Sequence, residues 1–108
     1  MSFTTICQES RTQWRRYLVV NPYTDDVKES DTFTRTFECD LDDRELVWHR
    51  DVKNRLVKVK SGVGWQLQMD NELPVELLPH HIYYIEAKRF HRLIKGSGTL
   101  ILEIKEDE

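Results

Sequence analysis

Two histidines and one aspartate are the side chains whose types and spacing could do chemistry. His49 and Asp51 stand two residues apart, and His91 follows in a separate stretch much later in the chain. Successive side chains of a β-strand point to opposite faces, so His49 and Asp51 would share one face of a strand. If the stretch around His91 lies beside that strand, two imidazoles and a carboxylate converge. Both group types are metal ligands, so the elements around them decide whether a site forms.

The alternation of apolar and polar residues predicts an all-β domain. Strands are predicted over 32–37, 45–51, 55–60, 65–69, 82–85 and 99–104. Ser61-Gly62 would end the third of these strands, and 73–77 would be a short edge strand because it contains Pro74. About seven or eight short strands, with turn signals roughly every ten residues, indicate a sandwich or barrel. Residues 106–108 are acidic and are predicted to be a solvated tail.

The N-terminal part gives weaker signals. Residues 1–30 are predicted to be an extension, and residues 31–108 the barrel domain. The segment 11–20 fits either a short helix or an edge strand, and Pro22 would end that element. Residues 25–31 are polar and acidic, and we expect them to be a connection.

Composition describes one globular domain. The chain has 108 residues, of which 39% are hydrophobic and 32% charged, with a net charge of −3. This balance gives no case for a nucleic-acid partner, and no apolar run approaches the roughly 20 residues of a membrane span. The first residues lack the basic start and apolar core of a secretory signal. Cys7 and Cys39 are interpreted as free thiols in the cytoplasm, although a bridge between them is the alternative.

The two chemical stretches resemble the motifs of the cupin family of small β-barrels. The first motif, G-x5-H-x-H-x3/4-E-x6-G, is matched in spacing by His49, Asp51, Arg55 and Gly62. The second, G-x5-P-x-G-x2-H-x3-N, is matched in spacing by His80, Glu86, Lys88, His91 and Lys95. Only His49, Gly62 and His91 keep the family's residue type. The resemblance covers roughly residues 32–105 and is greatest to short, single-domain cupins of unassigned function.

This resemblance implies a cupin-type double-stranded β-helix, or jelly-roll barrel, which would dimerise through an edge strand or an N-terminal arm. It also implies a divalent metal, which cupins hold with three histidines and a glutamate. Here Asp51 takes the place of one histidine and Arg55 that of the glutamate. Arg55 cannot be a ligand because a guanidinium has no free lone pair. His49, Asp51 and His91 remain, and two histidines with one carboxylate suit non-haem Fe(II). Their order also resembles that of iron and 2-oxoglutarate oxygenases.

Two functions follow from these residues. In the first, His49, Asp51 and His91 bind Fe(II), Zn, Mn or Ni, while Arg55 binds a small anionic molecule. Iron would support oxygenase chemistry, and the other ions would act as Lewis acids in an isomerase or lyase. No nucleotide cofactor is predicted. In the second, the barrel is metal-free and binds a small ligand or a protein without catalysis. Arg55 favours this alternative because it would form a salt bridge with Asp51 and would place a positive charge beside any bound cation. Two like unit charges about 4 Å apart repel by about 4 kcal/mol at an effective dielectric near 20.

Overall fold

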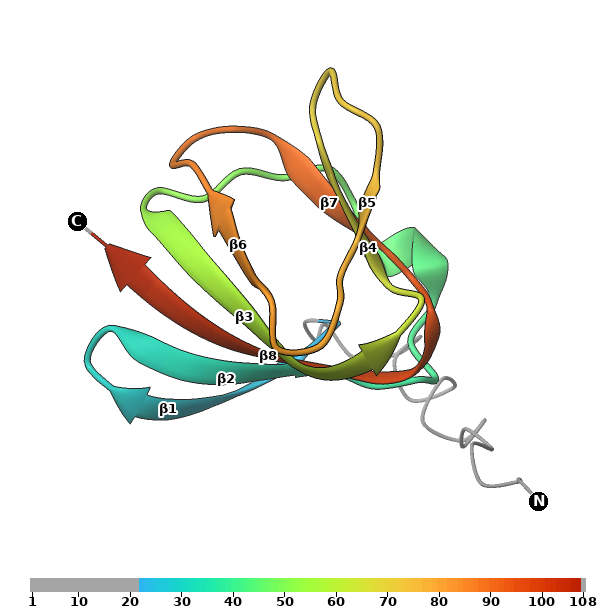
Figure 1. The fold of residues 1–108 in the computed structure, drawn as a ribbon, viewed down its shortest axis with the longest axis horizontal. Coiled ribbons are helices and arrows are strands. Elements are labelled where there is room, and N and C mark those ends of the chain that lie inside the picture. Colours follow the sequence, from blue (N-terminus) through green and yellow to red (C-terminus); the bar gives the residue numbers. More distant parts are fainter. Residues whose placement is uncertain (1–21, 108) are drawn as a thin grey trace.

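Two antiparallel sheets make up the part of the chain that the computed structural model describes, residues 22–107. The elements are β1 (Thr24–Glu29), β2 (Thr32–Phe37), the 3-10 helix η1 (Asp43–Glu45), β3 (Asn54–Val63), β4 (Gln66–Met69), β5 (Val75–Glu76), β6 (Ile82–Ile85), β7 (His91–Ile94) and β8 (Ser97–Asp107). The larger sheet has the order β1-β2-β8-β3-β6 and the smaller β5-β4-β7 (Figure 1). The predicted element at 11–20 lies outside the described residues.

The core fills the space between the two sheets. Alternate residues of β8, Leu100, Leu102 and Ile104, are buried, as the alternation of side chains along a strand requires. They meet Leu67 of the smaller sheet and Trp65, which comes just before β4 and is fully buried. Burying one such side chain stabilises the fold by about 1.5–3 kcal/mol. The core determines which side chains of β3 and β8 point inward. The predicted strands at 32–37 and 82–85 are confirmed as β2 and β6.

Two predicted elements are corrected by the structure. Residues 25–31 are not a connection, because β1 pairs with β2 along most of its length. Every residue of β1 is exposed, so the strand lacks the apolar alternation by which strands are recognised. The stretch 45–51 is not a continuous strand: η1 occupies its start, and only His49 forms a bridge. The domain division at residue 30 stays a prediction.

Gly62 bends β3 rather than ending it. The strand continues to Val63, and its register with β8 shifts on both sides of Ser61. Gly62 has φ +146°, and a Cβ there would lie 2.6 Å from Cδ1 of Leu100. An L side chain is strained in that conformation and would collide with the core, so the glycine is required by both backbone and packing.

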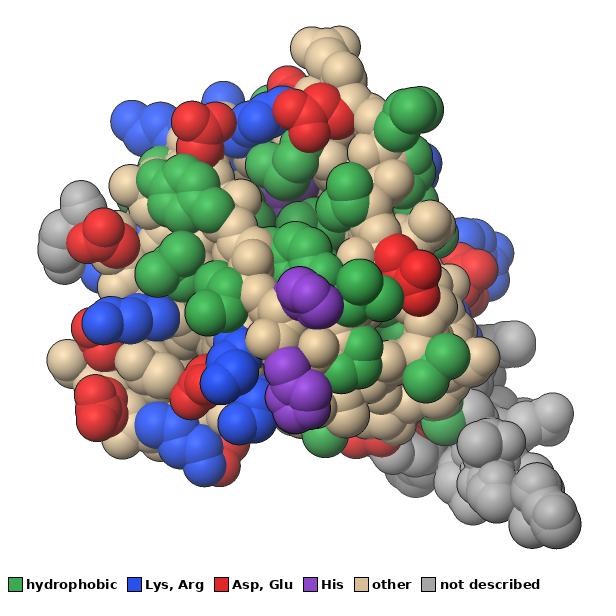
Figure 2. Space-filling view, in the orientation of Figure 1, with side chains coloured by type: hydrophobic (Ala, Val, Ile, Leu, Met, Phe, Trp, Pro, Cys, Tyr) green, Lys and Arg blue, Asp and Glu red, His purple; other side chains and the backbone are tan. Residues whose placement is uncertain are grey.

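The outer face of the larger sheet is partly apolar. Leu56 of β3 lies opposite Tyr84 of β6, and Lys58 lies opposite Ile82. Leu56, Ile82 and Tyr84 are all exposed, and Figure 2 shows hydrophobic side chains gathered over β3 and β6. Between residues 22 and 107, no helix has the length and apolar character to cross a membrane.

Cys39 is not the free thiol that the sequence suggests. It is disulfide-bonded, and Cys7 lies outside the described residues. The thiol argument therefore no longer supports a cytoplasmic location, which stays a prediction.

Candidate metal centre

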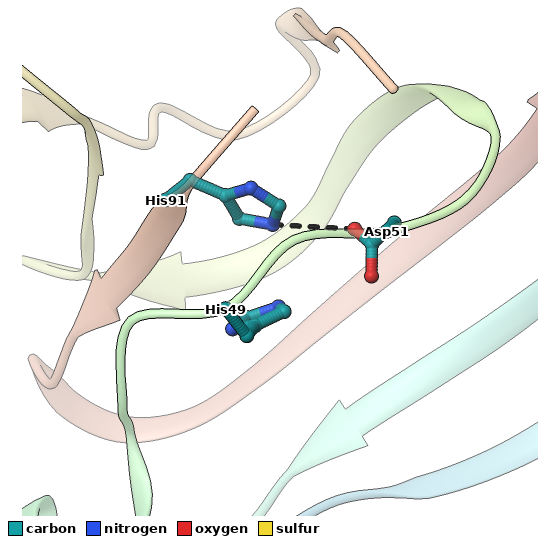
Figure 3. A group of neighbouring side chains, drawn as sticks. All are labelled: His49, Asp51 and His91. Atoms are coloured by element: carbon teal, nitrogen blue, oxygen red, sulfur yellow. Dashed lines mark ion pairs between the residues drawn. The ribbon is translucent and has the colours of Figure 1, made fainter. Parts of the chain in front are cut away.

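The two histidines lie directly opposite each other on neighbouring backbone segments. The His49 amide donates to the His91 carbonyl at 3.0 Å, and the His91 amide donates back to the His49 carbonyl at 2.9 Å. Side chains of such an antiparallel pair lie on the same face. The ring centroids are 4.4 Å apart (Figure 3). His91 begins β7 and is only 3% exposed, whereas His49 is at the exposed edge.

Two arginine–aromatic contacts lie on the other face of the same segments. Arg92 is 4.8 Å from the ring of Trp48, and Arg50 is 5.0 Å from the ring of Phe90. A slip of one residue in strand register moves every side chain to the opposite face. Both arginine–aromatic contacts would be lost if one segment slipped by one residue. They therefore favour the observed register, in which His49 lies opposite His91.

Backbone carbonyls fix the tautomer of both imidazoles. Nδ1 of His49 is 3.0 Å from the Val47 carbonyl oxygen, and Nδ1 of His91 is 2.9 Å from that of Arg89. A carbonyl oxygen only accepts hydrogen bonds, so each Nδ1 must carry the proton and donate it. In a neutral imidazole, Nε2 then keeps its lone pair. This is the arrangement of histidines that bind metals through Nε2.

Asp51 completes the group from the loop after His49. Its Oδ2 is 3.3 Å from Nε2 of His91 and 3.1 Å from Nη1 of Arg55. Both contacts are close enough for ion pairs, yet buried Oδ2 has no hydrogen-bond partner of good geometry. Burial raises the pKa of Asp51, but the contact with His91 in its protonated form and the positive charge of Arg55 outweigh burial and lower that pKa below its usual value.

Arg55 bridges two carboxylates beside the histidines. Its Nε and Nη2 donate to Oε2 of Glu106 at 2.9 and 2.7 Å, while Nη1 faces Asp51. Its side chain is 14% exposed, so these contacts are partly shielded from water. The alternative in which Arg55 pairs with Asp51 therefore has direct support from the geometry.

All four predicted site residues line one cavity of about 260 Å³. One ligand atom from each of His49, Asp51 and His91 lies within 4.8 Å of the others. The remaining wall is mainly apolar and includes Leu67, Leu77, Leu93 and Leu102. The cavity is smaller than the roughly 300–1,000 Å³ of drug-sized sites, so it fits a small molecule.

Sequence reasoning missed one charged residue of this cluster. Glu106 was assigned to a solvated tail, but it belongs to β8 and lies directly opposite Arg55. The signal for it was present only in the pairing of β3 with β8, because opposite charges on facing residues stabilise a sheet. Sequence spacing alone does not provide that register.

No protein-family model and no curated protein sequence matches this chain. Solved structures do match. A cupin-2 domain protein from Shewanella frigidimarina has a TM-score of 0.60 and 13% identity, over 96% of this chain and 97% of that one. DMSP lyase DddQ from Ruegeria pomeroyi has a TM-score of 0.66 and 11% identity, over 81% of this chain and 47% of the lyase. Fe(II)-HppE bound to an alternative substrate has a TM-score of 0.58 and 18% identity, over 79% of this chain and 48% of HppE.

These similarities establish the fold. The full-length match to a cupin-2 domain protein confirms the predicted all-β, cupin-type barrel. The chain spans about half of DddQ and of HppE, so nothing of their activities transfers with the fold.

Proposed function

We propose that this chain, which has the cupin fold, binds one divalent metal ion through Nε2 of His49, Nε2 of His91 and a carboxylate oxygen of Asp51. One observation carries the proposal. Both imidazoles donate their Nδ1 proton to a backbone carbonyl, which leaves the Nε2 lone pair of each ring available. Nε2 of His91 lies 3.3 Å from a buried Asp51 oxygen that has no well-formed hydrogen bond, and a ligand atom of His49 lies within 4.8 Å of both. Electron-pair donors that meet without an N–H or O–H between them attract a cation.

The donor set fits such an ion in chemistry and nearly in distance. Nitrogen and oxygen ligands at about 2.0–2.2 Å from one ion are at most about 4.4 Å apart. The three ligand atoms lie within 4.8 Å, so the set would contract slightly on binding. Two imidazoles and a carboxylate suit Fe(II), Mn, Ni or Zn. When bound, the ion would supply either oxygen chemistry, if it is iron, or Lewis-acid polarisation of a ligand oxygen.

The chain's own residues would bind and orient a small molecule beside the ion. The apolar wall would enclose the body of the ligand and exclude water from it. Arg55 lines the same cavity, and we propose that it contacts an anionic group of that ligand, a role suited to its planar donors. Such a group would compete with Asp51 and Glu106 for the guanidinium.

A second candidate function is a metal-free barrel that binds a small ligand or a protein without catalysis. The 3.1 Å contact between Arg55 and Asp51 favours it. An ion pair of this kind is satisfied inside the protein and needs no metal.

Metal analysis separates the two functions. The purified protein would be reconstituted with Fe(II), Mn(II), Ni(II) and Zn(II), desalted, and assayed for bound metal beside Asp51→Ala and His91→Ala. His81→Ala is the matched control, since His81 is exposed and lies just after a turn, outside the site. The metal site predicts one ion per chain in the wild type and the control, and none in the two variants. No bound metal in the wild type would support the metal-free barrel. Metal retained in both variants would show that the ion binds elsewhere and would overturn the proposed site.

We also propose a homodimer. The exposed side chains of edge strand β6, Ile82 at 62% and Tyr84 at 54%, support it, because a bare apolar edge tends to pair with another chain. Light scattering behind a sizing column should give twice the monomer mass for the wild type and less for an Ile82→Lys, Tyr84→Lys double variant. A wild type of monomer mass would contradict the dimer.

A further inference from the structure

Glu106 is the principal partner of Arg55. The two residues face each other across the β3–β8 ladder, and two guanidinium N–H groups converge on one Glu106 oxygen. Asp51 receives a single, longer contact that does not form a proper hydrogen bond. The orientation of the guanidinium is therefore set mainly by β8 rather than by the Asp51 loop.

This partnership changes the charge of the candidate metal centre. Without Glu106, the Arg55 cation would offset the Asp51 anion, and a metal ion would meet a site of no net charge. With Glu106 included, one positive group lies between two negative ones. When both histidines are neutral, the cluster keeps one net negative charge that can attract a divalent cation.

We propose that Glu106 is a positioning residue for this centre: it cancels the charge of Arg55 and keeps Asp51 available to a metal ion. The inference rests on the proposed metal site. It accounts for how a barrel can carry arginine in the place where the cupin pattern has a metal-binding glutamate. In Glu106→Gln, Arg55 loses its anionic partner and turns fully to Asp51, which raises the competition that a metal must overcome.

A double-mutant cycle tests this role. Zn(II) and Mn(II) affinities would be measured by calorimetry for the wild type, Arg55→Gln, Glu106→Gln and the double variant. We expect Glu106→Gln to weaken binding by about 10-fold or more, the range typical of residues that support a metal ligand. Arg55→Gln should bind at least as tightly as the wild type. The double variant should bind at least as tightly as the wild type, because it keeps the same net charge and has no Arg55 cation for Glu106 to cancel.

Two further variants separate this role from general stability. Glu106→Asp keeps the charge and should restore most of the affinity. Glu103→Gln removes the same charge from β8 but lies on the opposite face of the strand, opposite Lys58, so it should leave the affinity unchanged. Thermal unfolding of each metal-free variant reports whether it is folded at the temperature of titration.

The outcomes distinguish this inference from the proposed function. If the wild type binds metal and Glu106→Gln binds it equally well, or if the double variant is as weak as Glu106→Gln, the role of Glu106 is overturned and the metal site stands. If only variants that lack Arg55 bind metal, Glu106 does not offset Arg55, and the inference is again overturned. If no variant binds metal, the proposed metal site itself fails and the inference fails with it.

Discussion

The candidate centre has two sides that are built differently. On the imidazole side, His49 and His91 each have one nitrogen held by the backbone and the other left without a donor. On the charged side, Asp51, Arg55 and Glu106 are arranged so that opposite charges meet. The imidazole side offers electron pairs to a ligand from outside the chain. On the charged side, the positive and negative groups are largely paired with one another.

This difference indicates that the imidazole side contributes mainly to metal binding, whereas the charged side contributes mainly to the stability of the fold. Neutral histidines contribute little to folding through charge, whereas a partly buried ion-pair cluster stabilises a fold only while all its members are present. Asp51 belongs to both sides, since its Oδ2 faces both His91 and Arg55. Variants on either side should therefore separate metal affinity from the free energy of unfolding.

The largest expected effect is that of His49→Ala on the metal. Loss of one of three ligands should lower the affinity for Zn(II) or Mn(II) by more than about 100-fold, beyond what a supporting residue contributes. The metal-free protein should unfold at nearly the wild-type denaturant concentration, because His49 is exposed. Calorimetric titration and urea unfolding of the same samples measure both quantities. If His49→Ala keeps its metal affinity, the imidazole side does not provide the metal ligands.

Asp51→Asn should reveal the charged side through its pH dependence. The pKa of Asp51 is lowered in the folded protein, so its ionised form stabilises the fold above about pH 4, the range of an unfolded aspartate, and that stability is lost as the pH falls through the folded value. At pH 7 the substitution should lower the free energy of unfolding by about 1–3 kcal/mol, because it removes the negative charge that faces Arg55 and His91 in a partly buried site.

Urea unfolding at pH 7, 5 and 3 measures this effect. The difference in free energy of unfolding between the wild type and Asp51→Asn should be smaller at pH 3 than at pH 7. Asp26→Asn, on the exposed strand β1, should have the wild-type free energy of unfolding at all three pH values. A gap of constant size at all three values would mean that the Asp51 charge does not stabilise the fold.

Trp48→Ala should have a smaller effect, because it removes a contact on the outer face. The arginine–aromatic contact with Arg92 is worth about 0.5–1 kcal/mol at an exposed position. Metal affinity should fall several-fold if this contact helps to hold the histidines opposite each other. Leu73→Ala is the control, since Leu73 is an exposed apolar residue at 84%. Equal metal affinity in both variants would exclude a role for the outer face.

The smallest effect is expected at Val52, the residue next to Asp51. Its side chain is 82% exposed, and Val52→Ala should change the free energy of unfolding by less than about 0.5 kcal/mol. Metal affinity should be unchanged. A larger change would show that the loop conformation, rather than the Asp51 carboxylate, determines the behaviour of the charged side.

The sequence predicted the barrel and the meeting of His49, Asp51 and His91 because both depend on local periodicity and on motif spacing. Strand β2 alternates clearly in sequence, and the bounds of β2 and β6 were both predicted correctly. The spacing of His49 and Asp51 placed both side chains on one face even though the segment is a single bridge rather than a strand. Local pattern was sufficient here because an extended backbone alternates its side chains whether or not it is fully paired.

The missed features depend on strand pairing and backbone geometry, which the types and spacing of side chains do not specify. Strand β1 is exposed and polar, and it is held by pairing with β2 and by the ion pair of Asp25 with Arg35. Glu106 matters only because the β3–β8 register places it opposite Arg55. The carbonyls of Val47 and Arg89 fix the imidazole tautomers through backbone geometry. Contacts of this kind cannot be predicted from the pattern of side chains along the sequence.

The single bridge between His49 and His91 also has a kinetic consequence. Segments held by few backbone hydrogen bonds open locally without global unfolding. In metal-free protein, the His49 amide should therefore exchange its hydrogen with solvent sooner than the amide of Val59, a fully buried residue of β3 whose amide donates to the His81 carbonyl. A bound ion would join the two segments through their side chains as well, so exchange at His49 would slow while exchange at Val59 would change little.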